Sequence, residues 1–337
     1  TVFNNYFLPE ELPDLMDTSL KEQEIFSVKK DDVFITRTSE TVGALEMGCV
    51  AVKDYPKATF SGFVKRLRPK TTGIVYSKYI AFFLRSKYFR KVLDCNTIMT
   101  LRASFNEDMF SFLYLYLPDY EEQVRIGDLL YKMEMKIRTN NKINDNLEQQ
   151  IQLIFDYLFP DVCAGNKHMG DFIIPKRGKS LLSKNAVHGN VPVIAGGLEP
   201  SIYHNVANTI APVVTISSSG ANAGFVNIWG VPVWSSDSSY IDSEMSRYVY
   251  FWYAYLKRHQ NNIYNIQTGS AQPHIYPSHI SSLPITDLDY KKIENYTEIV
   301  SPIFSTITKN HVENQHLQSL RDWLLPMLMN GQATISD

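Results

Sequence analysis

A helical heptad pattern occurs twice in this chain, at positions 170 residues apart. The first copy consists of Ile126, Leu130, Met133, Ile137, Asn140, Asn144, Leu147, Ile151, Ile154 and Leu158, and the second of Tyr296, Val300, Ile303, Ile307, Asn310, Asn314, Leu317, Arg321, Leu324 and Leu328. A 3.5-residue period held over such a length is typical of a coiled-coil helix. A buried asparagine at such a position fixes the register of a helix pair. We therefore predict that the two helices pack on each other, with Asn140 and Asn144 facing Asn310 and Asn314.

Each long helix follows a block of a different character. Residues 1–118 and 161–284 contain short runs of β-branched and aromatic residues separated by turn residues, and this pattern predicts strands. Each block also carries one aromatic-rich helical segment, Ser77–Val92 in the first and Ser246–Asn261 in the second. Both blocks close on Leu-Pro, where proline marks the break before the long helix. The chain is therefore interpreted as one unit that occurs twice.

This duplication predicts the fold. We expect an α+β protein with two pseudo-symmetric mixed α/β domains, separated by two long helices that form an antiparallel coiled coil. The expected division is 1–118 for the first domain, 119–160 for the first helix, 161–284 for the second domain and 285–337 for the second helix. Pro302 lies inside the second helix and is expected to kink it or to start it afresh.

Composition indicates a folded protein of a reducing compartment. The chain has 337 residues, of which 44% are hydrophobic and 20% charged, so it is long enough for two domains with their own cores. Three widely spaced cysteines, Cys49, Cys95 and Cys163, form neither a disulfide framework nor a metal-binding CxxC pair. The sequence shows neither a signal peptide nor an apolar run of membrane-spanning length. We expect a cytoplasmic protein.

Positive charge is concentrated in the first block. The chain has a net charge of −2, but residues 61–102 contain ten basic residues and one acid, a local charge of +9 that leaves −11 for the rest. Such a local field can attract a polyanion even when the whole molecule is slightly acidic. A charge run that only keeps a surface soluble is the alternative interpretation.

Motifs of the common enzyme classes are missing from the sequence. Gly178-Lys179-Ser180 has the ending of a phosphate-binding P-loop, but Ile173 stands where the first glycine belongs. There is no Gly-x-Ser-x-Gly elbow, no glycine loop or Asn/Asp-Pro-Pro-aromatic motif for S-adenosylmethionine, and no histidine spacing that suits a metal. We therefore expect a non-catalytic protein without cofactors.

Several motifs recur in a family-specific order. They are the junction Leu117–Ile126, the helix segment Lys136–Glu148, the segment Leu320–Gly331 and, in the second block, Ile194-Ala-Gly-Gly197, Ile216-Ser-Ser-Ser-Gly220 and Gly269-Ser-Ala-Gln-Pro-His274. In this order they resemble the DNA specificity (S) subunits of Type I restriction-modification systems. The first block lacks a counterpart of Lys176-Arg-Gly-Lys179, so we expect a shortened or divergent natural N-terminus. The second junction lacks the Glu-Gln of the first, which weakens the case for equivalent docking there.

The resemblance implies a non-catalytic subunit that recognises DNA. It implies that each globular block is a target-recognition domain that reads one half of a split, asymmetric double-stranded DNA site, while the helices set the gap. It further implies two methyltransferase subunits docked on the helices and globules, with restriction subunits beyond them. A coiled-coil scaffold whose two globules bind protein or glycan is the alternative function.

Charge and hydrogen-bonding chemistry select the candidate DNA-binding residues. For contacts to phosphates we predict Lys65, Arg66, Arg68, Lys70 and Arg102 in the first block, and Lys176, Arg177 and Lys179 in the second. For contacts to bases we predict the loop residues Ser218, Ser219, Asn222, Gln267, Gln272 and His274, since Gln and Asn can read adenine in the major groove. Turn capping by Ser and Asn is the alternative for this second set.

Overall fold

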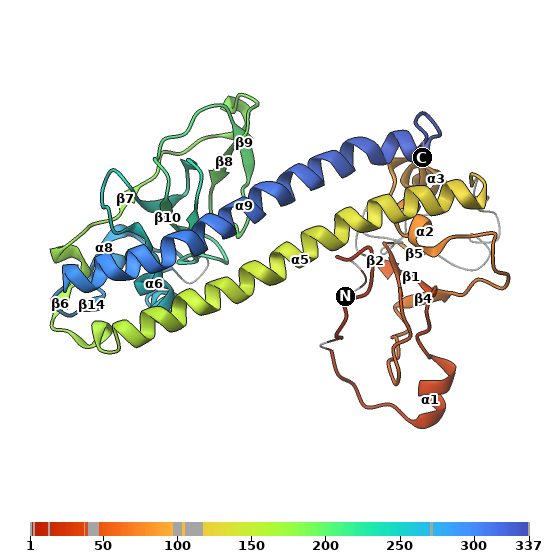
Figure 1. The fold of residues 1–337 in the computed structure, drawn as a ribbon, viewed down its shortest axis with the longest axis horizontal. Helices are drawn as coiled ribbons and strands as arrows, with labels where there is room; N and C mark the ends of the chain where they lie inside the picture. The colour runs from red at the N-terminus through yellow and green to blue at the C-terminus, as the bar shows by residue number, and fades with distance from the viewer. Residues whose placement is uncertain are drawn as a thin grey trace. The chain divides into compact units, whose positions relative to one another are not determined.

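The computed structural model describes residues 2, 4–12, 14–36, 38–39, 47–96, 103–104, 117–269 and 272–335. The chain divides into two compact units: unit 1 comprises Thr1–Arg138 and Asn314–Asp337, and unit 2 comprises Thr139–Glu313. Two long helices, α5 (Tyr120–Leu158) and α9 (Tyr290–Met329), contribute residues to both units (Figure 1). The expected α+β class with two long helices is confirmed. The domain boundaries at residues 118, 160 and 284 stay a prediction.

Within the described residues, unit 1 combines a small antiparallel sheet with short helices. The strands of the sheet follow the order β3 (Gly48–Val50), β1 (Val33–Thr36), β4 (Val64–Leu67). A separate pair of short strands consists of β2 (Thr38–Ser39) and β5 (Ala103–Ser104). The helices are α1 (Leu20–Ile25), α2 (Ser77–Phe83) and α3 (Lys87–Asn96). Helix α2 is buried because its aromatic side chains face the long helices. Tyr79 and Phe82 of α2 share one core with Ile126 and Leu130 of α5 and with Leu328 of α9.

Unit 2 is built around a larger β structure. One antiparallel sheet has the order β11 (Val226–Trp229), β10 (Val213–Ser217), β13 (Ser238–Asp242), β7 (Lys176–Arg177); a second has the order β12 (Trp234–Ser235), β8 (Val191–Ile194), β9 (Ile202–His204); and β6 (Lys167–His168) pairs with β14 (Pro284–Ile285). The helices are α6 (Val249–Arg258), α7 (Gln260–Asn265) and α8 (Pro277–Ser281). Strand β10 is buried along its whole length, as its apolar run requires. Its Val214 and Ile216 share a core with Phe251 and Tyr255 of α6.

The two long helices begin at equivalent points of the repeat. Asp119 accepts a hydrogen bond from the Glu122 N–H at 2.8 Å before α5. Asp289, 170 residues later, accepts from the N–H groups of Lys291 and Lys292 at 3.1 Å before α9. Aspartate at this position satisfies amides that have no partner inside the helix, and its charge complements the helix dipole. The same start signal thus defines both helices.

The long helices pair antiparallel within each unit. In unit 2, the ring of Phe155 on α5 lies 5.6 Å from the ring of Tyr296 on α9, and Asn310 Nδ2 donates to Asn144 Oδ1 at 2.8 Å. In unit 1, Arg321 NH1 lies 3.1 Å from Glu134 Oε2. Residue numbers rise along one helix as they fall along the other, so the antiparallel prediction is confirmed.

The seam asparagines confirm one predicted pair and add an unexpected partner. Asn144 and Asn310 form the predicted amide–amide hydrogen bond. Asn140 Nδ2 donates to the Glu313 carboxylate at 2.7 Å, and its predicted contact with Asn314 stays a prediction. Asn140 and Asn144 are almost fully buried, at 1% and 3% exposure. These hydrogen bonds specify the register, because an apolar contact at the same level would tolerate a shift along the helix.

Pro302 was expected to kink the second helix or to start it afresh, and the second of these alternatives is wrong. Helix α9 continues through this residue from Tyr290 to Met329. Proline has no N–H, so the carbonyl of Glu298 one turn earlier loses its helical partner. Both Glu298 and Pro302 are exposed, and water can therefore satisfy that carbonyl without a break in the helix.

Replacing Asn144 with Ala is expected to lower the free energy of unfolding by about 1–3 kcal/mol. Asn144 itself is buried, and the change leaves the partly buried Asn310 amide without its acceptor; a donor that loses its partner in a protein interior costs about that much. Urea denaturation measures the loss. Asn146→Ala, at an exposed position of the same helix, is the matched control and should fall within about 0.5 kcal/mol of the original protein. Equal stability of the two variants would contradict a register-fixing role.

Candidate nucleic-acid interface

Two loops of unit 2 that lie far apart in the sequence form one surface. Ile275 N donates to Ser218 O at 2.9 Å and Gly220 N donates to Pro273 O at 3.0 Å. The Gln267 amide closes the contact, with Nε2 donating to Ala223 O at 2.7 Å. We call residues 218–224 and 267–275 the loop cluster, of which 270 and 271 lie outside the described residues. The cluster contains all six residues predicted to contact bases.

Two further segments contact the loop cluster, the turn between β12 and β13, whose Asp237 O accepts from Ser218 N at 3.1 Å, and the loop after β8, and strand β7 packs on that turn. Strand β7 leads into Gly178, whose N–H donates to Ser238 O at 2.8 Å, and Lys179 N donates to Ser235 O at 2.9 Å. A β-carbon added at Gly196 would lie 2.4 Å from Ser219 O, so the loop after β8 approaches the cluster closely. The motifs at residues 176–179, 194–197, 216–220 and 269–274 are therefore brought together at one end of the sheet.

The six predicted base-contacting residues differ in availability. Ser218 is buried, and its hydroxyl has no hydrogen-bond partner among the described residues. The Ser219 hydroxyl donates to Asp237 Oδ2, and the Gln267 amide is occupied within the cluster. The Asn222 carbonyl accepts from Phe225 N at 3.0 Å, as in a turn. Gln272 is exposed and His274 is partly exposed, with its ring stacked on that of Tyr276 at 6.1 Å.

Three predicted phosphate contacts of unit 2 lie beside this cluster. Lys176 and Lys179 are exposed, and neither side chain has a hydrogen bond or ion pair within the described part of the chain. Arg177 is also exposed, but its NH2 lies 2.5 Å from Asp237 Oδ1. The two lysines are therefore available for phosphates, while the arginine already has an anionic partner.

The predicted cations of unit 1 mostly serve the fold. Arg66 NH1 donates to Ser27 O at 2.6 Å, and its guanidinium lies 5.4 Å from the Phe60 ring. Arg68 forms an ion pair with Asp32 at 2.5 Å, which raises the pKa of the guanidinium through that hydrogen bond. Lys65 is half-buried on β4, Lys70 is exposed, and Arg102 lies outside the described residues.

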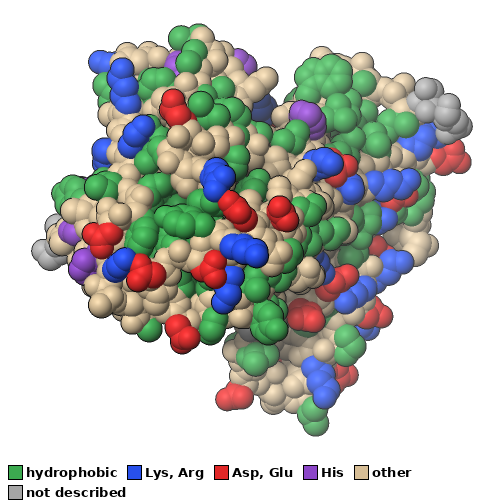
Figure 2. Space-filling model, turned by 60° about the vertical axis from the view of Figure 1, so that its left-hand side comes forward, with side chains coloured by type: hydrophobic (Ala, Val, Ile, Leu, Met, Phe, Trp, Pro, Cys, Tyr) green, Lys and Arg blue, Asp and Glu red, His purple; other side chains and the backbone are tan. Residues whose placement is uncertain are grey.

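The +9 run also overstates the free positive charge of unit 1. Lys78 Nζ lies 2.7 Å from Asp128 Oδ1. Arg85 donates to the carbonyls of Gly48, Val2 and Asn5 at 2.8–2.9 Å. Figure 2 shows a face on which Lys and Arg side chains are interspersed with Asp and Glu. Local charge counted along the sequence is thus a poor measure of local field.

Arg68→Ala is expected to destabilise unit 1 by about 3 kcal/mol. Asp32 is fully buried, and without Arg68 its carboxylate keeps only the hydrogen bond from the Lys29 N–H at 2.7 Å among the described contacts. We expect a cost at the lower end of the range for a broken buried ion pair, because that hydrogen bond remains and Arg68 is one-third exposed. Lys70→Ala, the exposed control, should change stability by less than about 0.5 kcal/mol. Urea denaturation of both variants is the measurement. An equally small effect for Arg68→Ala would show that the ion pair does not support the fold.

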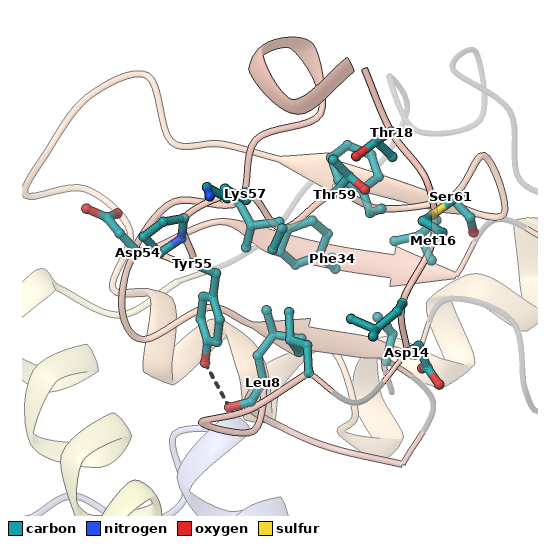
Figure 3. A pocket seen from close by; sticks show the side chains of 18 of the residues that line it. Leu8, Asp14, Met16, Thr18, Phe34, Asp54, Tyr55, Lys57, Thr59 and Ser61 are labelled. Atoms are coloured by element: carbon teal, nitrogen blue, oxygen red, sulfur yellow. Dashed lines mark hydrogen bonds between the residues drawn. The ribbon is translucent and has the colours of Figure 1, made fainter. Parts of the chain in front are cut away.

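A cavity of about 860 Å³ opens in unit 1 beside β1 and β4. Leu8, Val28 and Phe34 line its apolar part, and the Tyr55 hydroxyl donates to Leu8 O at 3.2 Å (Figure 3). Asp54 and Lys57, of opposite charge, lie together at one side of the cavity (Figure 3). Its chemistry suits an apolar group better than a phosphate.

Gln123 of the Glu-Gln junction has a structural role. Its Oε1 accepts from Tyr76 N at 2.9 Å, and its Nε2 donates to Ile74 O and Pro118 O at 3.0 and 2.9 Å. The side chain is 1% exposed. It therefore ties the start of α2 to the start of α5.

No group of acids, histidines and cysteines that could hold a metal ion occurs among the described residues. None of the helices that they form is long and apolar enough to span a membrane.

Asp237 is not among the residues predicted from the sequence. Cations were predicted to contact phosphates, and hydroxyl, amide and imidazole side chains to contact bases, whereas Asp237 is an acid. A signal was present, since Asp237 is flanked on both sides by pairs of serines in the turn that joins β12 to β13. Polar turns of this kind often place side chains at functional surfaces.

Comparisons with known proteins agree with the motifs. Residues 4–149 match the model of the Type I restriction modification DNA specificity domain. The Type I restriction enzyme HindI specificity subunit of Haemophilus influenzae is 26% identical over 218 residues, which cover 62% of this chain and 46% of the relative, or about half its length. The crystal structure of a Type I restriction-modification S subunit from M. genitalium shares the fold, with a TM-score of 0.59 at 16% identity, and the match covers 90% of this chain and 84% of that chain. These matches confirm the resemblance.

Proposed function

We propose that this chain, which resembles the Type I specificity subunits in sequence and fold, is a non-catalytic subunit that selects the DNA sequence on which a Type I restriction-modification complex acts. The observation that carries the proposal is the loop cluster of unit 2. There, four motifs that resemble those of the family meet beside Lys176 and Lys179, which have no side-chain partner among the described residues, and beside the exposed Gln272 and the partly exposed His274. Lysines suit phosphates, and Gln, Asn and His suit base edges.

We further propose that the two units read two halves of one asymmetric double-stranded site. The duplicated heptads and the equivalent helix starts at Asp119 and Asp289 support this proposal, because each globular block is followed by a long helix of the same type. Helix α5 has 39 residues and is about 58 Å long at 1.5 Å per residue. That length exceeds one turn of DNA, about 34–36 Å. The helices would therefore separate the two recognised blocks by an unread spacer.

Exposed apolar residues on the helices support docking of partner subunits. Leu153 on α5 and Trp323 on α9 stand 170 residues apart, at equivalent positions of the repeat, and are 67% and 64% exposed. Each has a second exposed apolar residue one helical turn away, Tyr157 beside Leu153 and Leu320 beside Trp323. Exposed apolar side chains that lie together mark protein interfaces. We propose that each position contacts one methyltransferase subunit, and that restriction subunits bind beyond them.

A salt titration tests the proposal against a scaffold that binds protein or glycan. Affinity for DNA should fall linearly with salt on logarithmic axes, and each lost phosphate contact should lower the slope by about one unit. We expect this reduction for Lys70→Ala, Lys176→Ala and Lys179→Ala. Lys292→Ala, an exposed lysine near the start of α9, is the control and should leave the slope unchanged. Binding without salt dependence, or equal slopes for all variants, would favour the scaffold.

A further inference from the structure

Asp237 connects two of the predicted DNA-binding residues. It lies in the turn between β12 and β13, where one carboxylate oxygen faces Arg177 NH2 at 2.5 Å and the other accepts from the Ser219 hydroxyl. Its backbone carbonyl accepts from Ser218 N at 3.1 Å. The same residue therefore holds strand β7 and the loop cluster at a fixed separation.

The Arg177 side chain contacts Asp237 and is otherwise partly exposed to solvent. Its side chain is 43% exposed, and the contact with Asp237 is its only hydrogen bond in the described part of the chain. Arginine has five N–H donors in a planar fork that matches two acceptors at once. Because Asp237 already restricts the side chain, binding costs less conformational entropy than it would for a free arginine. An arginine oriented in this way suits the O6 and N7 acceptors of guanine.

Arg177 differs from the neighbouring lysines in that its positive charge is neutralised by Asp237. Arg177 and Asp237 together carry no net charge, so the pair contributes little to the release of counterions from DNA. Lys176 and Lys179 on either side have no such partner among the described residues. The segment Lys176-Arg-Gly-Lys179 thus combines two cations suited to phosphates with one arginine suited to a base edge.

We infer that Asp237 is a positioning residue that orients Arg177 and Ser219 for base recognition, and that Arg177 reads a guanine and does not neutralise a phosphate. This inference rests on the proposed function and assigns it to specific groups. Removal of the Asp237 charge should relax discrimination at the base that Arg177 reads, without weakening electrostatic attachment to DNA.

The test is selection of bound sequences from a randomised DNA duplex library by the full chain in complex with the methyltransferase subunits, combined with salt titrations. Asp237→Asn and Arg177→Lys should both reduce the preference at one guanine position by about tenfold, since a bidentate contact contributes about 1–3 kcal/mol of discrimination. The salt slope should stay unchanged in Arg177→Lys and be unchanged or steeper in Asp237→Asn, because the latter loses a negative charge. Glu244→Gln, which removes the same charge at the opposite end of β13, should leave the preference unaltered.

The outcomes separate this inference from the proposed function. An original protein that selects no sequence would overturn both. An original protein that selects a sequence, with Asp237→Asn and Arg177→Lys retaining the same base preference, would overturn only the assignment of Arg177 and Asp237. Uniformly weaker binding with a lowered salt slope in Arg177→Ala would identify a phosphate contact. If Asp237→Asn does not fold, Arg177→Lys and Ser219→Ala replace it in the test, because each changes one of the two side chains that Asp237 contacts. The measurement is again the base preference selected from the library.

Discussion

Insertion of one heptad at the same level of both long helices is expected to lengthen the unread spacer of the DNA site by about three base pairs. Seven residues add about 10 Å of helix at 1.5 Å per residue, and one base pair occupies about 3.4 Å. Suitable points are after Arg138 in α5 and after Glu313 in α9, where neighbouring contacts pair Asn140 with Glu313. The two recognised blocks should keep their sequences, because neither globular part is altered. Mapping of methylated sites measures the spacer.

Insertion into only one helix is the matched control. On one side of the insertion, the residues that face the other helix move by two helical turns relative to their partners. The Asn144–Asn310 hydrogen bond and the Phe155–Tyr296 contact therefore cannot form together with the Arg321–Glu134 ion pair of unit 1. That variant should fail to fold. A stable, active protein with paired insertions and an unchanged spacer would contradict the proposal that the helices set the gap.

Gly196→Ala is expected to weaken sequence-specific DNA binding by about tenfold or more. The new methyl group would lie 2.4 Å from Ser219 O, so the backbone of the loop cluster must move. Forced overpacking of this kind costs about 1–3 kcal/mol, and 1.4 kcal/mol corresponds to tenfold in affinity. Affinity for a selected duplex, compared with affinity for random duplex, is the measurement.

The adjacent glycine provides the control for this prediction. A β-carbon at Gly197 would meet its nearest neighbour, Glu199 O, at 3.4 Å, an ordinary contact distance. Gly197→Ala should therefore bind close to the original level. Equal losses in the two variants would indicate that the loop after β8 tolerates no side chain at all, and equal retention would show that its approach to Ser219 is unimportant for binding.

The sequence predicted the long-range features that leave a periodic signal. The 170-residue repeat predicted an antiparallel helix pair, and the two asparagines in each copy predicted polar contacts across it. The hydrogen bond between Asn144 and Asn310 confirms one such contact. The loop residues Ser219 and His274 were nominated for their chemistry, and the structure places them in one isolated bridge. Turn residues identify loops, although they do not show which loops meet.

Side-chain pairing could not be predicted in the same way. Arg68 was assigned to a surface because it lies in a basic run, yet its partner Asp32 comes from a strand start 36 residues earlier. Arg177 and Asp237 are 60 residues apart. Such ion pairs depend on strand register, which a charge count along the chain does not contain. Pro302 was expected from its local chemistry to kink the second helix or to start it afresh, whereas α9 continues through this exposed position.

Selection from a randomised duplex library tests most directly whether this chain specifies a bipartite DNA sequence. The full chain, together with the methyltransferase subunits proposed as its partners, should enrich two short blocks separated by a spacer of constant length and variable sequence. Each block should address a separate major-groove segment, since the helix length exceeds one DNA turn. Enrichment of a single continuous block would contradict a bipartite site. Enrichment of no sequence, with binding that is only salt-sensitive, would contradict sequence recognition by this chain.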